Sequence, residues 1–176
     1  MALEMAVLAA GLLIAASILF YTLKTGTPPM PTAPKVKAVL LSMTPEDVAG
    51  TVFEIGSGWG TLAFSLARRY PDNRVAGLEV SPVPWLVSRL WLRLHPHANL
   101  ELHWTDAMKT NLSGAGLVVC YLNPGGMEKL AAKLAAELRP GAYVLSNTFA
   151  LSGWQPLRTS ETSDLYASKV YLYRKP

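Results

Sequence analysis

A cluster of glycines placed directly after an apolar segment is the part of this sequence best suited to binding a ligand. Residues 52–55 are apolar apart from Glu54, and Gly56, Gly58 and Gly60 follow them before an amphipathic stretch. Glycines let a tight turn approach a ligand without interference from β-carbons, and the first N–H groups of a following helix are free to donate hydrogen bonds. The pattern therefore predicts a nucleotide-binding loop between a strand and a helix.

The spacing of these glycines separates two kinds of nucleotide ligand. A dinucleotide-binding loop of the G-x-G-x-x-G type needs glycine at position 61, where Thr61 stands. The chain instead carries E-x-G-x-G-x-G, which resembles the loop of class I methyltransferases. The resemblance implies S-adenosylmethionine as the cofactor, with Glu54 near its methionyl part. It also implies a cofactor-binding loop made of Gly56, Ser57, Gly58 and Gly60.

Two more acidic residues follow the next two apolar runs. Glu79 ends the run 75–79, and Asp106 comes shortly after the run 100–104. A carboxylate at the first of these positions can accept hydrogen bonds from both ribose hydroxyls. The resemblance implies that Asp106 contacts the adenine amino group. Together with Glu54, these acids mark the ends of three consecutive predicted strands, so we expect them to converge on one cofactor.

The second half of the chain makes the resemblance more specific. It is similar to the small membrane-anchored lysine methyltransferases of mitochondria, which modify the ATP synthase c subunit and the adenine nucleotide translocase, and to their prokaryotic relatives. The likeness covers about residues 50–174 and includes a strand followed by Pro124 and the spacing of Phe149, Trp154 and Pro156. The N-terminal apolar segment also matches that architecture.

This resemblance indicates where a methyl acceptor binds. Amino-methyltransferases place an Asn/Asp-Pro motif where Asn123 and Pro124 stand, and an amide or carbonyl oxygen there can accept hydrogen bonds from an amine. The alternative is that Asn-Pro-Gly only turns the chain after a strand. Trp154 and Tyr166 are predicted to line the acceptor channel, since aromatic faces attract a methylated ammonium. Packing in the core is the alternative for both rings.

Three loop positions depart from the pattern of that family. Its members usually have aspartate at position 54, an acid at 59 and arginine at 61, whereas this chain has Glu54, Trp59 and Thr61. Glutamate preserves the carboxylate, but an indole at position 59 can reshape the approach to the methionyl end. The acceptor is therefore less well defined than the cofactor. A membrane-tethered module that binds the cofactor or a partner without catalysis stays open as an alternative.

Alternating apolar runs and amphipathic stretches surround these motifs, a pattern typical of a mainly parallel sheet. We expect an α/β, Rossmann-like class I methyltransferase fold. No helix separates the last strand from the fifth, so we expect the last strand to pair antiparallel at or near an edge. The predicted strands are 51–55, 74–78, 100–104, 117–122, 142–146 and 169–173. The predicted helices are 62–70, 84–94 and 127–138, with a short one beginning at Thr44.

The first residues predict a transmembrane anchor. From Met5 to Leu23 the chain has no charged residue and no proline, and a helix of this length is about 28 Å long, close to the ~30 Å of a bilayer core. A cleaved signal peptide and a buried helix are the alternatives. Lysines follow the segment and nothing basic precedes it except the terminal amine, so the positive-inside rule predicts a cytoplasmic domain. The expected parts are an anchor at 1–24, a stiff proline-rich linker at 25–37 and a methyltransferase domain at 38–176.

Composition argues against several other kinds of site. The single cysteine, Cys120, excludes an internal disulfide, and the net charge is only +4. Arginines lie on predicted helices at positions 68, 69, 89 and 93 without alternating aromatic residues, so no nucleic-acid surface is predicted. No metal site is predicted either, because acids and cysteines at metal-ligand spacing are missing around the three histidines, His95, His97 and His103.

The favoured function is N-methylation of a lysine in a membrane protein, with the lipid bilayer as a further partner. Confining enzyme and acceptor to one membrane raises their effective concentration without new contacts. Methylation of a lipid, a quinone or another small hydrophobic acceptor is the alternative enzymatic function, because membrane attachment explains it equally well.

Overall fold

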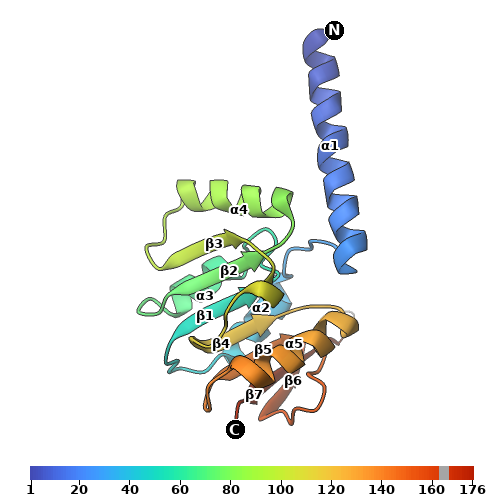
Figure 1. Ribbon diagram of the computed structural model, residues 1–176. Coiled ribbons are helices and arrows are strands. Elements are labelled where there is room, and N and C mark those ends of the chain that lie inside the picture. The colour runs from blue at the N-terminus through green and yellow to red at the C-terminus, as the bar shows by residue number, and fades with distance from the viewer. Residues whose placement is uncertain (163–166) are drawn as a thin grey trace.

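A seven-stranded sheet organises the chain (Figure 1). The computed structural model describes residues 1–162 and 167–176. The strand order is β3-β2-β1-β4-β5-β7-β6. Five strands run parallel, namely β1 (Thr51–Ile55), β2 (Val75–Glu79), β3 (Leu100–Trp104), β4 (Ala115–Cys120) and β5 (Tyr143–Asn147). The last two strands, β6 (Arg158–Glu161) and β7 (Lys169–Arg174), pair antiparallel, β7 with both β5 and β6. The predicted Rossmann-like α/β fold and its antiparallel last strand are confirmed.

Helices cover both faces of this sheet. Every residue of β2 and of β4 is buried, as expected for parallel strands covered on both sides. One core cluster joins the sheet to α2 (Pro34–Met43), α3 (Ala63–Arg69) and Trp85 of α4 (Pro82–Leu94). A second cluster joins the other face to α5 (Pro124–Glu137) and the short 3-10 helix η1 (Ala107–Lys109).

The strand order reverses direction at β1, which lies between β2 and β4. In open α/β sheets, ligands bind beyond the carboxyl ends of the strands at such a reversal. The glycine-rich loop leaves β1 at this edge, so the topology places it where a cofactor is expected.

The segment before β1 differs from the expectation. A helix was predicted to begin at Thr44, but α2 ends at Met43 and Thr44 is extended with a ψ of 137°. Proline at position 45 disfavours helical geometry at the residue before it. The helix lies earlier because Val36, Leu40 and Met43 form one apolar face that packs into the core. The prediction was wrong because burial of that face outweighs the local capping pattern.

Strand β6 was also missed by the sequence analysis. Its four residues, Arg158–Glu161, are polar, and only one of them is even partly buried. A polar edge strand has no alternating apolar pattern, so only its backbone pairing with β7 reveals it.

An isolated N-terminal helix, α1 (Ala2–Thr25), extends away from the domain (Figure 1). It has 24 residues, none of them buried, and it is long and apolar enough to cross a membrane. It ends at Gly26, whose φ of 68° is the left-handed conformation that commonly terminates helices.

The proline-rich segment after α1 folds against the domain. The Trp59 indole N–H donates to the carbonyl of Pro29 at 2.6 Å, and the Thr32 N–H donates to the Thr61 hydroxyl at 3.3 Å. The end of the predicted linker already belongs to α2, which begins at Pro34. Two hydrogen bonds therefore hold this segment against the glycine-rich loop.

Candidate cofactor and acceptor site

The glycine loop adopts a backbone that favours glycine at three positions. Gly56, Gly58 and Gly60 have φ values of 72°, 51° and 81°. A β-carbon at Gly60 would lie 3.1 Å from both the Phe64 ring and the Ser88 β-carbon, which is tighter than most real contacts. The spacing E-x-G-x-G-x-G is thus explained by backbone geometry and by close packing under the loop.

Glu79 ties this loop to the next helix. Its side chain is buried at the end of β2, and one carboxylate oxygen accepts a hydrogen bond from the Gly58 N–H at 2.7 Å. The other oxygen accepts from the Ser81 N–H at 2.7 Å, directly before α4. A carboxylate offers about four acceptor positions, so both oxygens keep the capacity to accept ribose hydroxyls.

Glu54 is buried beneath the loop with an unused acceptor. Its Oε2 atom and the Ser57 hydroxyl have no hydrogen-bond partner among the described residues, and both residues line a narrow cavity of about 40 Å³. Burial raises the pKa of the Glu54 carboxyl well above its ordinary value, and the negative charge of Glu79 raises it further. A buried carboxyl group with one unpartnered oxygen next to a glycine loop suits a cationic ligand group.

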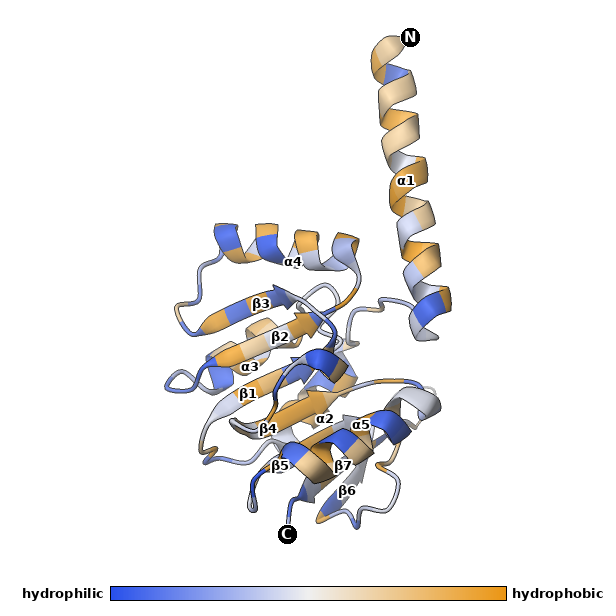
Figure 2. Ribbon diagram, viewed as in Figure 1, coloured by the Kyte–Doolittle hydropathy of each residue, from blue (hydrophilic) through white to orange (hydrophobic). Residues whose placement is uncertain are grey.

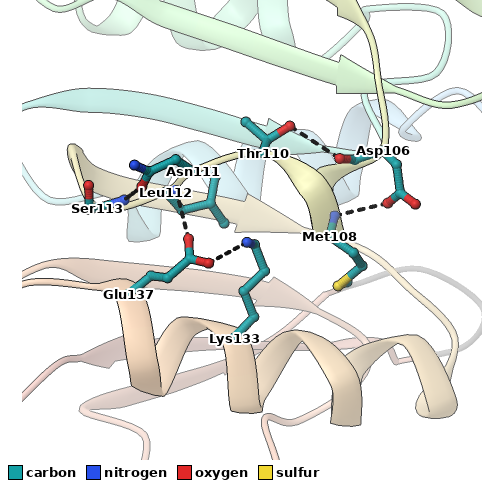
Figure 3. Close-up of polar contacts among 8 residues, drawn as sticks. All are labelled: Asp106, Met108, Thr110, Asn111, Leu112, Ser113, Lys133 and Glu137. Carbon is teal, nitrogen blue, oxygen red and sulfur yellow. Dashed lines mark hydrogen bonds and ion pairs between the residues drawn. The ribbon is translucent and has the colours of Figure 1, made fainter.

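Asp106 lies on the other side of Gly56, in a cavity of about 240 Å³. Its Oδ1 atom accepts from the Met108 N–H at 2.9 Å and caps η1, while its backbone carbonyl accepts from the Thr110 hydroxyl at 3.1 Å (Figure 3). One carboxylate oxygen is left without a described partner in these contacts. The side chain is therefore positioned by η1 and can still receive a donor from the adenine base.

Figure 3 also shows how the chain beyond η1 is fixed to α5. The Leu112 N–H donates to the Glu137 carboxylate at 2.8 Å, and Lys133 forms an ion pair with the same carboxylate. Lys133 holds the pKa of Glu137 below its ordinary value through this contact, and the N–H of Leu112 acts in the same direction. These contacts stabilise the wall that carries Asp106.

The cavities with Glu54 and Asp106 share Ile55 and Gly56, so they flank the glycine loop at the carboxyl edge of the sheet. A larger cavity of about 640 Å³ lies around Gly50, Gly114 and Arg139, at the opposite ends of the strands. It contains none of the predicted site residues. The two smaller cavities are the candidate site because they bring Glu54 and Asp106 to the glycine loop at the expected edge, while Glu79 holds that loop through the Gly58 N–H.

Asn123 is engaged at both ends of its side chain. Its Oδ1 atom caps α5 by accepting from the Gly126 N–H at 2.8 Å, and its Nδ2 group donates to the carbonyl of Thr25 at the end of α1. Pro124 is the first residue of α5 and is exposed. The predicted acceptor motif therefore also joins the domain to the base of the N-terminal helix.

Of the two aromatic residues predicted for the acceptor channel, the structure describes Trp154, which packs against β7. Trp154 packs edge-to-face on Tyr173 with ring centroids 6.2 Å apart, and Lys175 lies over the same indole. Tyr173 pairs with Val144 near the start of β5, so Trp154 is not brought together with the glycine loop. Tyr166 lies outside the described residues.

Other residues at this edge were missed by the sequence analysis. Asn147 at the end of β5 and Met30 of the linker both line the cavity that contains Glu54. Tyr121, which is partly exposed, lines it too and stacks on Phe149 at 6.3 Å. For Asn147 the available signal was its position directly after the predicted strand 142–146, since carboxyl ends of parallel strands share one edge. Met30 comes from the linker and carried no such signal.

The fold and this arrangement define a class I S-adenosylmethionine-dependent methyltransferase. The family model described as the ANTKMT methyltransferase domain matches residues 54–158, so the chain belongs to that family. A protein-lysine N-methyltransferase of Saccharolobus islandicus (strain REY15A) is 26% identical over 156 residues, which cover 83% of this chain and 92% of the relative.

Two mouse proteins are also similar. The adenine nucleotide translocase lysine N-methyltransferase is 34% identical over 61% of this chain and 47% of its own length. The lysine N-methyltransferase of the ATP synthase c subunit is 31% identical over 63% of this chain and 44% of its own length. The chain thus spans about half the length of these mouse relatives.

Solved structures agree with the fold and the cofactor. An RNA methyltransferase from Salinibacter ruber in complex with S-adenosyl-L-homocysteine superposes with a TM-score of 0.74 and 29% identity, over 84% of this chain and 94% of that one. A precorrin-6y C5,15-methyltransferase from Geobacter metallireducens shares the fold, with a TM-score of 0.65 and 16% identity over 83% of this chain and 93% of that one. S-adenosylmethionine is therefore the cofactor, and the unpartnered Glu54 and Ser57 atoms fit its polar methionyl end.

Proposed function

We propose that this methyltransferase modifies the side-chain amine of a lysine in a membrane protein. The observation that carries the proposal is the hydrogen bond from Asn123 to the carbonyl of Thr25. It places the predicted acceptor motif at the base of α1, the candidate membrane-spanning helix. A lysine presented close to the membrane surface by a neighbouring protein would reach this position. The names of the archaeal and mouse relatives support lysine as the modified residue.

We assign the cofactor contacts as follows. Glu54 faces the cationic methionyl end, Glu79 receives the ribose hydroxyls and Asp106 receives the adenine amino group. The glycine loop supplies close backbone approach, through Gly56, Ser57, Gly58 and Gly60. These assignments are supported by burial of the first two carboxylates and by the cavities on both sides of Gly56.

The acceptor amine has to be neutral to react. A lysine with its reference pKa of about 10.4 is uncharged in only about one molecule in a few thousand at pH 7. Apolar surroundings disfavour the charged form, and Tyr121 and Phe149 provide such a wall. S-adenosylmethionine would supply a methyl group on a positively charged sulfur. The amine lone pair would take the methyl in line, S-adenosylhomocysteine would leave as the neutral sulfide, and the methylated amine would release a proton to water. Asn123 and the start of α5 at Pro124 orient the amine.

The membrane attachment completes the proposal. We assign α1 as a single transmembrane span with the domain on the cytoplasmic side, because Lys24 lies in its last turn and Lys35 and Lys37 follow it. Sharing one membrane raises the effective concentration of a membrane-protein acceptor.

The decisive experiment uses the full chain in vesicles with host membrane proteins and labelled S-adenosylmethionine. Asn123→Ser keeps an N-cap oxygen for α5 but removes the amide. We expect this variant to bind S-adenosylmethionine in calorimetric titration yet to lose protein-lysine methylation. Asn111→Ser is the matched control, since Asn111 is exposed and caps only Ser113. Label found only in the organic-soluble fraction would instead identify a lipid or quinone acceptor, and no label in any fraction would identify a binding module without catalysis.

A further inference from the structure

Helix α4 carries an apolar face that the domain leaves uncovered. Its inner side packs on β3 and β2, with Ser88 fully buried and the Trp85 indole donating to the carbonyl of Leu102. Its outer side exposes five large apolar residues by roughly half or more, namely Leu86, Val87, Leu90, Trp91 and Leu94. At 100° per residue, these five positions form one continuous arc of the helix surface. Figure 2 shows the orange segments of α4 alternating with blue ones along its length.

Two arginines of α4 lie beside the apolar arc. Arg89 and Arg93 are one helical turn apart and exposed, and neither forms an ion pair with a residue that the structure describes. An exposed apolar arc that contains tryptophan and borders on cationic side chains is the composition of helices that lie in a membrane interface. The arginines are suited to anionic headgroups, and the leucines and Trp91 to the boundary with the acyl chains.

The location of α4 fits the same surface. It lies next to α1 and crosses the end of the domain from which α1 projects (Figure 1). The residues of α1 that are partly covered, including Ser17, Ile18 and Tyr21, lie in its C-terminal half. If α1 spans the bilayer, its last turn with Tyr21 and Lys24 reaches the boundary of the headgroup region, and α4 packs next to α1.

We propose that the outer face of α4 binds the surface of the bilayer that α1 crosses, with anionic phospholipid as its partner. The inference rests on the proposed membrane anchoring by α1 and adds a second contact that fixes the orientation of the domain. Glu79 links the glycine loop to the start of α4 through Ser81. Docking of α4 therefore holds the cofactor site at a set height and angle above the membrane, as a membrane-protein acceptor requires.

The test is a label-accessibility measurement on the full chain in phosphatidylcholine/phosphatidylserine vesicles. A nitroxide is attached at Leu90→Cys, and Ala132→Cys on the exposed side of α5 is the matched control. The native Cys120 does not interfere, since its thiol is buried and burial raises its pKa to about 12. We expect the nitroxide at position 90 to collide several-fold less often with a water-soluble nickel chelate than the nitroxide at position 132 does. Collisions with oxygen should be more frequent at position 90 than at position 132.

A charge variant tests the chosen partner. Arg89→Gln together with Arg93→Gln should reduce protection at position 90 in vesicles that contain phosphatidylserine and have little effect in pure phosphatidylcholine. Equal nickel accessibility at positions 90 and 132, in a chain that resists carbonate extraction, would overturn the α4 contact while leaving the α1 anchor intact. Extraction by carbonate would overturn both. Protection that appears only at high protein-to-lipid ratio, or only when an acceptor protein is added, would overturn the lipid assignment in favour of a protein partner.

Discussion

At the residue scale, the carboxylates of this site combine structural and ligand-binding roles. Glu79 accepts hydrogen bonds from two backbone N–H groups, that of Gly58 in the glycine loop and that of Ser81 before α4. Asp106 caps η1. Of the three acids, Glu54 is the one that keeps a buried carboxylate oxygen with no partner among the described residues. The acids therefore shape the site before any ligand arrives, and their substitution affects both folding and affinity.

Replacing Glu79 by glutamine places an amide N–H₂ where a carboxylate oxygen now accepts from Gly58 or Ser81. Because a buried donor then faces a donor, we expect a loss of about 1–3 kcal/mol in stability and a marked loss of S-adenosylmethionine affinity. Thermal unfolding and calorimetric titration measure the two effects. Glu101→Gln is the control, since Glu101 forms an exposed pair with Arg74. Unchanged affinity in Glu79→Gln would exclude the assigned role.

Glu54 predicts a pH dependence of stability. Its pKa is raised in the folded chain by burial and by Glu79. The folded state therefore holds the proton to higher pH than the unfolded state does, and stability falls as pH rises from about 4.5 through the folded pKa. We expect Glu54→Gln to abolish this decline. The melting temperature of the variant, relative to that of the wild type, should therefore increase as the pH rises from 4 to 7.

The matched control for Glu54→Gln is Glu46→Gln, because Glu46 is exposed. If the melting temperatures of Glu54→Gln and of the wild type changed with pH by the same amount across this range, the assignment of the pH dependence to Glu54 would be contradicted. The same pair of variants also tests the cofactor contact assigned to Glu54. Glu54→Gln should weaken the binding of S-adenosylmethionine, whose sulfur is positively charged, more than that of S-adenosylhomocysteine, whose sulfur is neutral.

At the scale of elements, the departures from the family pattern acquire a common explanation. Two of the three departing positions, Trp59 and Thr61, bind the linker, at Pro29 and Thr32. The linker also lines the cavity around Glu54 through Met30 and Thr32. The changed loop residues thus fit a chain in which the segment after α1 forms one wall of the cofactor site.

Trp59→Phe removes the indole donor and keeps an aromatic ring. We expect faster hydrogen exchange in residues 26–33 and a several-fold weaker binding of S-adenosylmethionine, in line with a loss of about 1 kcal/mol for one hydrogen bond. Trp104→Phe loses a comparable hydrogen bond, from its indole to the carbonyl of Val80, away from the linker. Equal exchange in the two variants would show that the linker is not held by Trp59.

At the scale of the whole molecule, α1 contributes little to the core. None of its residues is buried, whereas α2 already packs into the first core cluster. The hydrogen bond from Asn123 reaches only the last residue of α1, Thr25. The helix is therefore separable from the fold.

A chain that begins at Thr25 is expected to keep the melting temperature and S-adenosylmethionine affinity of the full domain, because it retains Thr25 and the linker. It should leave the membrane fraction and methylate a membrane-protein acceptor far more slowly at equal enzyme concentration, since the shared membrane no longer concentrates the pair. Rates equal to those of the full chain in vesicles would contradict the tethering argument. A detergent-solubilised acceptor, on which both forms should act equally, is the control.

The sequence by itself determined the features that depend on near neighbours. These local patterns are the glycine spacing, the acids at strand ends and the run of apolar residues in α1. Each predicted its element or ligand, because the covalent chain sets the distances between residues that are close in sequence. The boundaries moved by one or two residues in most elements, as with β2 and α4. A local capping pattern failed at Thr44, where burial of α2 decided the outcome.

Only the tertiary structure decided how distant segments meet. It joined Asn123 to Thr25, laid the linker over Trp59 and Thr61, and placed Trp154 on Tyr173 at the far end of β5. It also turned one face of α4 outward beside α1. These contacts join residues that are far apart along the chain, and no local spacing encodes them. They depend on which faces the sheet and its helices bury together, and that is settled only when the whole core packs.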